Sequence, residues 1–314
     1  IGHTRKWLQY FGVFFRRYFS AADREELPFN RAERQWVHRA SVNADNTRAF
    51  GSTRDLRVEG VPFFVNAPFP GLGEQSVAPV PLLIGPYARK PYAHAAFFNI
   101  SAMSFGALSA PAVRALSRGA AKAGIWLDTG EGGLAPYHLE GGCDLIFEIG
   151  TAKYGLRTAD GRLDDDRLRA VCAHPEVKMV SVKLSQGAKP GLGGLLPGAK
   201  VTPEIALIRG IAVGEDSVSP NRHPEVANVS ELLDFIAHVR EVSGVPVGFK
   251  AVLGGIEWIR DLCMEVHRRG VASAPDFIVL DGSEGGTGAS PQTLMEGMGL
   301  PLRESLPLLI ATLV

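Results

Sequence analysis

Two lysines lie near the ends of apolar segments, where an unpaired charge would be costly to bury. Lys183 follows the run VKMVSV, and Lys250 lies within the run VPVGFKAV. A buried ammonium group needs an anionic partner. For a single lysine, a structural carboxylate is the simplest partner. For two lysines, the pattern favours an anionic ligand.

The stretch LSQGAKPGLGGLLPGAKVT, residues 184–202, contains five glycines and two prolines and fits neither a helix nor a strand. Glycines allow backbone amides to approach a ligand closely. Gln186 and Lys189 lie among these glycines and could donate hydrogen bonds to an anion. Lys200 follows the turn at Pro197 and is expected to be a solvated residue at a helix entry.

A second glycine-rich segment, DGSEGGTGAS, follows an apolar run. The backbone amides of Gly285, Gly286 and Gly288 could form a nest for a phosphate, and Thr287 could add a hydroxyl donor. The spacing is neither G-x-G-x-x-G nor a Walker loop. Together with the two lysines, such a nest would suit a reduced flavin nucleotide, whose negative charge develops near N1 and O2. A glycine-rich turn can also be a simple connection.

Glu131 lies between glycines in the segment DTGEGGLAPYH. A carboxylate in that position could hydrogen-bond an amine or imine, or could merely cap a turn. The sequence contains no G-x-S-x-G motif and no Ser-His-Asp order, which argues against a hydrolase. His223 is interpreted as a structural hydrogen-bond donor.

Short apolar runs that alternate with helical patterns must position these residues. Strands are predicted at residues 96–103, 125–130, 177–184, 245–252 and 276–282. Helices are predicted between and after them, the clearest at VSELLDFIAHVREVSG with Ser230 as its N-cap. The alternation indicates βαβ units and a parallel sheet.

The fold class expected from this pattern is α/β. Candidate functional residues follow every strand, which favours a (β/α)8 TIM-type barrel over a doubly wound sheet. Only five strands are visible, so the barrel is expected to be incomplete. We assign residues 96–314 to this barrel and residues 1–95 to a helical and irregular segment that wraps it.

The composition excludes several classes of function. Hydrophobic residues make up 46% of the 314 positions and charged residues 21%, as in ordinary globular proteins. The 33 basic and 33 acidic residues balance, which argues against nucleic-acid binding. The three cysteines, Cys143, Cys172 and Cys263, lack metal-ligand spacing and are interpreted as core residues in a reducing compartment.

The N-terminal segment RKWLQYFGVFFRRYF places aromatic residues at helical spacing between basic pairs. We expect a helix that docks on the main domain, with a membrane-surface helix as the alternative. No apolar run is long enough to span a membrane and no signal peptide is recognisable, so the cytoplasm is the expected location. Because the chain begins with Ile1, membrane attachment through an upstream segment stays open.

The motifs together resemble the synthase domain of glutamate synthase, an FMN-containing (β/α)8 barrel. The matching strings are NISAM, AMSFGALS, TGEGG, VKLSQGAKPGLGGLLPGAKVTPEIA and GGTGASP, in the order of the family. The strings LPFNRAERQWVHRA and AFGSTRD resemble the shorter bacterial relatives that lack the glutaminase domain. The chain is therefore similar to the FMN-binding glutamate synthase family.

The resemblance implies roles for particular residues. The backbone around Ala102 to Ser104 would pack against the isoalloxazine, and the two lysines would lie near its pyrimidine edge. The implied FMN-binding residues are Ala102, Met103, Ser104, Thr129, Lys183, Gln186, Lys250, Gly282, Gly285, Gly286 and Thr287. The implied substrate-binding residues are Glu131, Gln186, Lys189 and Arg209, of which Glu131 and Lys189 would be catalytic.

The resemblance implies hydride transfer from reduced FMN to 2-iminoglutarate, formed from 2-oxoglutarate and ammonia. Leu195 stands where the large synthases carry a glutamine, so a related 2-oxo acid is an open alternative. Two further alternatives are synthesis of N-methylglutamate with methylamine, and an inactive flavin-binding scaffold. The electron donor is not identified.

Two properties of the family concern what lies outside this chain. The ligands of its [3Fe–4S] cluster have no counterpart here, so such a cluster would belong to a longer parent protein. An incomplete parallel sheet exposes an unpaired edge, so we expect a longer chain, a partner subunit or a homo-oligomer to cover it.

Overall fold

The computed structural model describes residues 31–44, 63–72, 79–287 and 290–314. The chain separates into two units, residues 1–62 and residues 63–314. Helix α2 (Arg31–Ser41) is the described element of the first unit. The predicted N-terminal helix at residues 5–19 lies outside the described residues. In the part that is described, no helix is long and apolar enough to cross a membrane.

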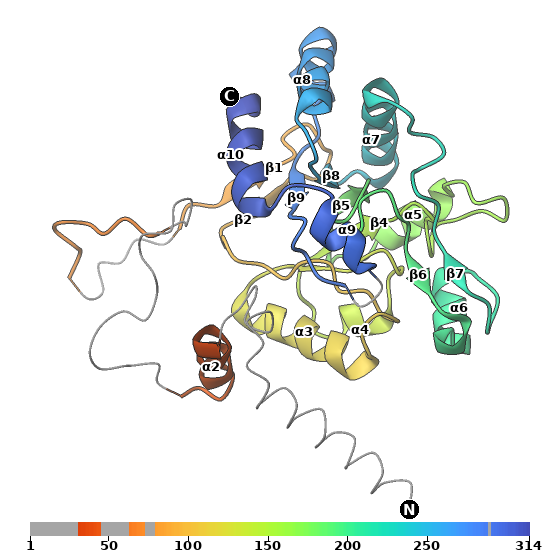
Figure 1. Ribbon diagram of the computed structural model, residues 1–314, viewed down its shortest axis with the longest axis horizontal. Helices are drawn as coiled ribbons and strands as arrows, with labels where there is room; N and C mark the ends of the chain where they lie inside the picture. Colours follow the sequence, from red (N-terminus) through yellow and green to blue (C-terminus); the bar gives the residue numbers. More distant parts are fainter. Residues whose placement is uncertain (1–30, 45–62, 73–78, 288–289) are drawn as a thin grey trace, which may run out of the picture. The chain divides into compact units, whose positions relative to one another are not determined.

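The second unit is built on a sheet of five parallel strands (Figure 1). Their order is β3 (Leu127–Asp128), β4 (Leu145–Ile149), β5 (Val177–Lys183), β8 (Val247–Val252) and β9 (Ile278–Asp281). Two antiparallel pairs accompany it: β1 (Leu82–Ile84) with β2 (Tyr92–His94), and β6 (Leu195–Leu196) with β7 (Ser217–Val218). The α-helices are α3 (Ala110–Ala123), α4 (Pro136–Leu139), α5 (Asp165–Cys172), α6 (Pro203–Arg209), α7 (Val229–Ser243), α8 (Glu257–Arg269), α9 (Gln292–Gly297) and α10 (Leu302–Leu313).

Helix α7 shows how the sequence produces an outer layer. Leu232, Ile236 and Val239 recur at helical spacing and are buried. The helix begins two residues earlier than predicted, because Asn228 is the N-cap and its side chain accepts a hydrogen bond from Glu231 N at 2.9 Å. The assignment of Ser230 as the N-cap is therefore wrong. Ser230 Oγ instead accepts a hydrogen bond from an arginine of α8 at 2.6 Å.

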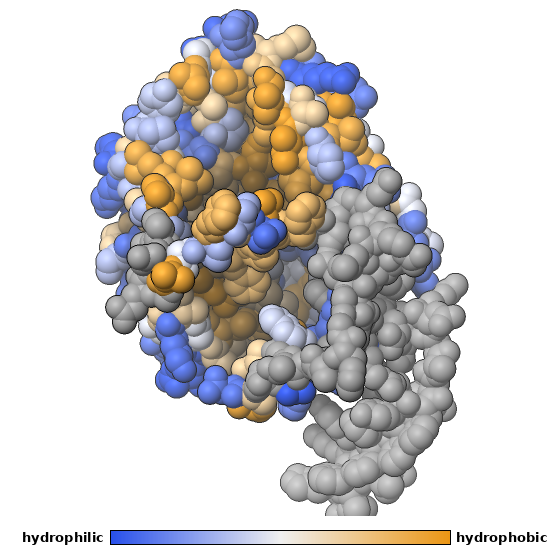
Figure 2. All heavy atoms as spheres, turned by 90° about the vertical axis from the view of Figure 1, so that its left-hand side faces the viewer, coloured by the Kyte–Doolittle hydropathy of each residue, from blue (hydrophilic) through white to orange (hydrophobic). Residues whose placement is uncertain are grey.

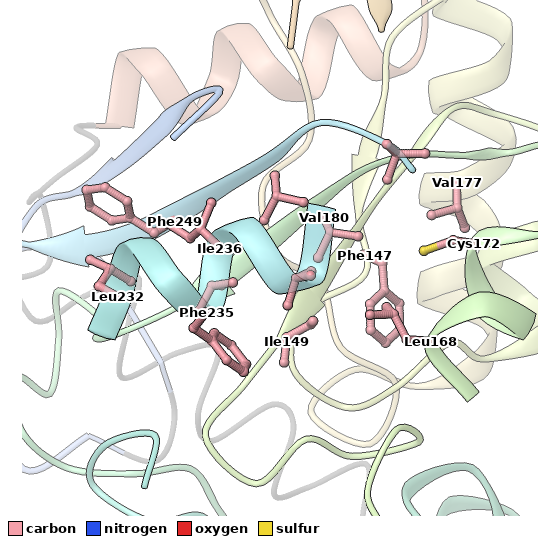
Figure 3. Packing of buried hydrophobic residues seen from close by; sticks show 14 of the residues in the cluster. Phe147, Ile149, Leu168, Cys172, Val177, Val180, Leu232, Phe235, Ile236 and Phe249 are labelled. Carbon is pink, nitrogen blue, oxygen red and sulfur yellow. The ribbon is translucent and has the colours of Figure 1, made fainter. Parts of the chain in front are cut away.

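The outer face of the sheet is an apolar layer beneath the helices (Figure 3). Phe147 and Ile149 of β4, Val180 of β5 and Phe249 of β8 are each no more than 1% exposed. They pack in one cluster with side chains of α5, α7 and α8. Successive side chains of a strand point to opposite faces, so the residues between these positions must line the inner face.

The inner face changes from apolar to charged along the strands. Ile146 and Met179 pair in register and pack against β2 at the amino ends. Two residues further on, β4 carries Glu148. Lys183, the last residue of β5, then pairs in register with Lys250, which lies two residues before the end of β8. The sheet therefore concentrates its charges where parallel α/β sheets bind ligands.

The strand predictions are confirmed for β5, β8 and β9, and in part for β3. The predicted strand at 96–103 is wrong as a named strand: Ile100 forms an isolated parallel bridge with Leu127, and Ile100 N donates to Trp126 O at 3.0 Å. Strand β4 was not predicted, because Glu148 interrupts a run of only five residues. The five strands expected and the five observed thus differ in one member.

The curled sheet forms part of a TIM-type barrel and does not close within the described residues. Strand β9 pairs with β8 alone among them. Figure 2 shows the face that lies on the left-hand side of Figure 1, where apolar side chains surround a hollow. Cys143 and Cys172 are buried in the core and Cys263 packs against it, which confirms their interpretation as core residues.

Candidate functional site

Three strands bring together one buried carboxylate and two lysines. Glu148 Oε2 lies 3.2 Å from Lys250 Nζ, and Glu148 Oε1 lies 3.7 Å from Lys183 Nζ. All three residues are at most 8% exposed. Burial would lower the pKa of Lys250, but Glu148, with Asp128 and Asp281, raises it above its ordinary value. The lysine therefore stays charged inside the sheet.

Glu131 extends this cluster above the end of β3. Its Oε1 lies 3.1 Å from Lys183 Nζ. Burial would raise the pKa of Glu131, but the charges of Lys183, Lys189 and Lys250 lower it below its ordinary value. A Cβ atom at Gly194 would lie 2.8 Å from Oε1, so the glycine-rich loop closes directly over this carboxylate. The predicted residues Glu131 and Lys183 thus meet in one site.

The loop after β5 contributes two of the predicted donors. Gln186 Oε1 accepts a hydrogen bond from Lys183 Nζ at 3.0 Å. Lys189 is 4% exposed, and its Nζ donates to Gly193 O at 3.3 Å. Burial, opposed by Glu131, lowers the pKa of Lys189. Lys200 is exposed next to helix α6, which confirms that it differs from Lys189.

The loop that follows β9 packs tightly against this one. Gly187 N donates to Asp281 Oδ2 at 2.8 Å, and a Cβ at Gly187 would lie 1.7 Å from Gly282 O. Only glycine allows the two backbones to approach so closely. Gly285 N already donates to Gly282 O at 2.9 Å, so this amide of the predicted nest is engaged within the loop.

The rest of the predicted phosphate nest is described in part. In the loop that follows β9, Gly286 is exposed and Thr287 is half-buried. Gly288 lies outside the described residues. The role of this segment as a phosphate site stays a prediction.

The segment 102–104 lies along the end of β3. Met103 N donates to Asp128 O at 3.0 Å, and Met103 O lies 2.9 Å from His138 Nε2. Ala102 and Ser104 flank it, and Ser104 O accepts from Leu108 N at 2.9 Å. These hydrogen bonds hold the backbone that is predicted to face a flavin beside the charged cluster.

Thr129 follows β3 directly and is fully buried. Its hydroxyl donates to Gly130 O and accepts from Glu148 N, each at 3.1 Å. The resemblance assigns Thr129 to the flavin site, and in this structure its hydroxyl links β3 to β4. Its contact with a cofactor stays a prediction.

Arg209, the remaining predicted substrate residue, ends helix α6 and is buried. Its Nη1 donates to Ser217 Oγ at 3.1 Å, and the guanidinium stacks on Tyr154 at 5.0 Å from the ring centroid. Its Nη2 would lie 3.3 Å from a Cβ at Gly132, immediately after Glu131. The arginine thus supports the turn that carries Glu131, and a direct contact with substrate stays a prediction.

His223 is buried beneath Lys183 and confirms its interpretation as a structural residue. His223 Nε2 lies 2.9 Å from Lys183 O, the expected arrangement for an N–H donor and a carbonyl acceptor. Burial lowers the pKa of His223 to about 4, so the imidazole is neutral at neutral pH. Its neighbour Glu225 pairs with the buried Lys153 at 2.9 Å.

Two acidic residues of the cluster were missed by the sequence analysis. Glu148 lies in the apolar run LIFEI, and Asp128 in the run WLD. Burial, followed by the charge of Glu148, raises the pKa of Asp128 to about 7. A lone acidic residue in a buried strand is itself a signal, because such a group needs a partner. Among the described residues, no group of three or more His, Cys, Asp or Glu side chains could hold a metal ion.

Comparison with known proteins places this geometry in a family. Residues 86–314 match the model of the conserved region in glutamate synthase. The chain is 36% identical over 347 aligned positions to the glutamate synthase large subunit-like protein YerD of Bacillus subtilis, covering 98% of this chain and 65% of that protein. It is 34% identical over 204 positions to the archaeal-type glutamate synthase [NADPH] of Thermotoga maritima, covering 64% of this chain and 36% of the relative.

A third relative is the glutamate synthase large subunit-like protein of Rhizobium meliloti, 32% identical over 215 positions and covering 68% of this chain. The chain spans less than two thirds of the length of each of these three relatives. The family match nevertheless covers the whole sheet and every predicted site residue from Ala102 to Thr287. The chain therefore belongs to the glutamate synthase family.

Proposed function

We propose that this chain carries a flavin-dependent oxidoreductase site that reductively aminates a 2-oxo acid such as 2-oxoglutarate. The observation that carries the proposal is the convergence of Lys183, Lys189 and Lys250 on Glu131 and Glu148. Three buried cations with two carboxylates suit an anionic ligand that also presents an amine or imine. Membership of the glutamate synthase family supports an oxidoreductase.

The residues present fit FMN. Lys183 and Lys250 offer cationic donors at the strand ends, where negative charge on a reduced isoalloxazine would be stabilised. Ser181 Oγ and Glu148 Oε1 are buried on the inner face without hydrogen-bond partners, so the described site has polar groups to spare. FMN, when bound, would supply the hydride.

The substrate side rests on Lys189 and Glu131. A dicarboxylate needs cations, and the buried ammonium of Lys189 is available above the cluster. Glu131 is ionised at neutral pH because its pKa is lowered, so it can accept a hydrogen bond from an ammonium or imine N–H. The amine would be held there while the oxo acid is oriented by the loop.

Leu195 bears on the choice of oxo acid. It lies in β6, is 49% exposed, and pairs in register with Val218. An apolar side chain there cannot donate to a carboxylate, which favours a smaller or differently oriented 2-oxo acid as the second candidate substrate.

The full chain, reconstituted with FMN and then titrated with 2-oxoglutarate, tests the proposal. We expect a flavin absorbance band that is perturbed by saturating oxo acid. A preparation that stays colourless after reconstitution contradicts the flavin assignment and supports the scaffold alternative. A flavin band that no 2-oxo acid perturbs contradicts the substrate assignment. Turnover of the reduced protein with ammonia or methylamine then identifies the amine.

A further inference from the structure

Glu148 is the one acidic side chain of strand β4, and it lies on the inner face of the sheet. Its carboxylate is 1% exposed and touches a lysine on each of two other strands, β5 and β8. The resemblance to the family assigns it no role in the sequence analysis. The Glu148 carboxylate therefore lies between the two lysines that are proposed to bind the flavin.

Without the Glu148 carboxylate, the ammonium groups of Lys183 and Lys250 would repel each other. Lys183 and Lys250 are register partners on neighbouring strands, and such partners lie about 5 Å apart at Cα. Two ammonium groups so close in a buried environment disfavour each other's charge. The Glu148 carboxylate reaches both, at 3.2 Å and 3.7 Å, so it offsets this repulsion.

The carboxylate is not saturated by these contacts. Glu148 Oε1 has no hydrogen-bond partner among the described residues, and its nearest cation is Lys183 at 3.7 Å. Lys183 also contacts Glu131 and Gln186, so its ammonium is shared among three groups. Lys183, Lys189 and Lys250 exceed Glu131 and Glu148 by one positive charge, which remains to attract an anion.

We propose that Glu148 is a positioning residue that holds the ammonium groups of Lys183 and Lys250 at the strand ends and reduces the positive charge they present to the flavin. This inference rests on the proposed function for the identity of the ligand. The lysine geometry itself is independent of that function. Neutralising Glu148 should therefore strengthen the attraction for anions even though it removes an ion pair.

The first measurement uses the FMN-loaded full chain with the substitution Glu148→Gln. Sulfite adds to flavin N5 as an anionic adduct, and its affinity reports positive charge near the flavin. We expect sulfite to bind roughly tenfold more tightly to Glu148→Gln than to the wild type, because one negative charge near the adduct is removed. Unchanged or weaker sulfite binding would overturn the inference.

The matched control is Asp276→Asn, which breaks another buried ion pair, with Arg240 at 2.8 Å, two residues before β9. We expect it to lower stability without changing sulfite affinity. If Asp276→Asn tightened sulfite binding as much as Glu148→Gln, the tighter binding would come from general destabilisation of the fold, and the inference would fail.

A second measurement needs no flavin. Trace acetylation of the flavin-free chain at pH 8, read out by peptide mass spectrometry, compares Lys250 with the exposed residue Lys122. We expect the relative reactivity of Lys250 to rise several-fold in Glu148→Gln and to stay unchanged in Asp276→Asn, because only the former removes the anion beside Lys250. Equal reactivity of Lys250 in wild type and Glu148→Gln contradicts the positioning role, whether or not the protein binds FMN.

Discussion

The two faces of the same five strands follow opposite rules. On the outer face, Phe147, Val180 and Phe249 pack against helices with almost no exposed surface. On the inner face, alternate positions of the same strands carry Glu148 and Lys250, which are also buried but charged. Two consecutive residues of one strand can therefore differ in their effect: the apolar side chain stabilises the fold, and the charged side chain costs free energy to bury.

This difference indicates where stability and function reside. Burial of an apolar side chain contributes about 1.5 to 3 kcal/mol, whereas a buried ion pair is often no better than an apolar replacement. The outer face can thus support a cluster of charges that would not be retained for stability alone. Phe249→Ala and Lys189→Met test whether the apolar layer and the charged cluster can be changed independently, and two further variants test buried titratable groups beside the cluster.

The largest effect is expected from Phe249→Ala on the outer face. Phe249 is fully buried and contacts Trp258 at 5.7 Å between ring centroids. Its truncation should lower the free energy of unfolding by about 3 to 5 kcal/mol in urea denaturation. Ligand affinity of the folded fraction should stay nearly constant. Leu207→Ala, at a residue that is 83% exposed, should change stability by less than about 0.5 kcal/mol.

Lys189→Met should show the reverse pattern. The loss of a buried cation should weaken 2-oxo acid binding by about 100-fold, because a buried charged partner contributes about 2 to 5 kcal/mol to a complex. Stability should change little, since methionine fills a similar volume without a charge. Flavin titration and urea denaturation measure the two effects. Lys200→Met, at an exposed residue of the same loop, should leave 2-oxo acid binding unchanged. Equal loss of FMN binding and 2-oxo acid binding in Lys189→Met would contradict the assignment of this loop to the substrate.

His223 should make stability depend on pH between about 6.5 and 4. Its pKa is lowered to about 4 in the folded chain, so unfolding takes up a proton in that range. The stability that neutral His223 contributes is complete above pH 6.5 and is lost as the pH falls, by about 2 kcal/mol between pH 7 and pH 5. Urea denaturation of His223→Gln should lack this loss. His238→Gln, at an exposed histidine, should retain it; an unchanged profile in His223→Gln would exclude the buried neutral imidazole.

Asp128 should make the free energy of unfolding depend on pH in the opposite direction to His223, with the smallest effect of the four variants. Its pKa is raised from 3.8 to about 7 in the folded chain, so the folded state holds a proton that the unfolded state has lost. Stability should therefore fall as the pH rises, by about 1.4 kcal/mol between pH 6 and pH 8. Asp128→Asn should remove this slope in urea denaturation, whereas Asp261→Asn on the surface of α8 should keep it. A slope that persists in Asp128→Asn would place the raised pKa elsewhere.

Much of this organisation can be predicted from local patterns. Helix α8, strands β5 and β8, and the position of both lysines at strand ends follow from periodicity and from the rarity of charge in apolar runs. The short strand β4 escaped prediction because five residues with a central glutamate match neither an alternating nor a continuous apolar pattern. The N-cap at Asn228 was missed because Ser230, two residues later, also fits the capping preference.

The sequence by itself determined the family and which residues could carry chemistry, since lysines at strand ends and glycine-rich loops are local features. Only the tertiary structure decided their partners. Glu148 meets Lys250 across 102 positions of sequence because parallel strands bring their carboxyl ends to one edge. Gly187 touches Gly282 for the same reason. Long-range strand order, which no local pattern encodes, converts separate charges into one site.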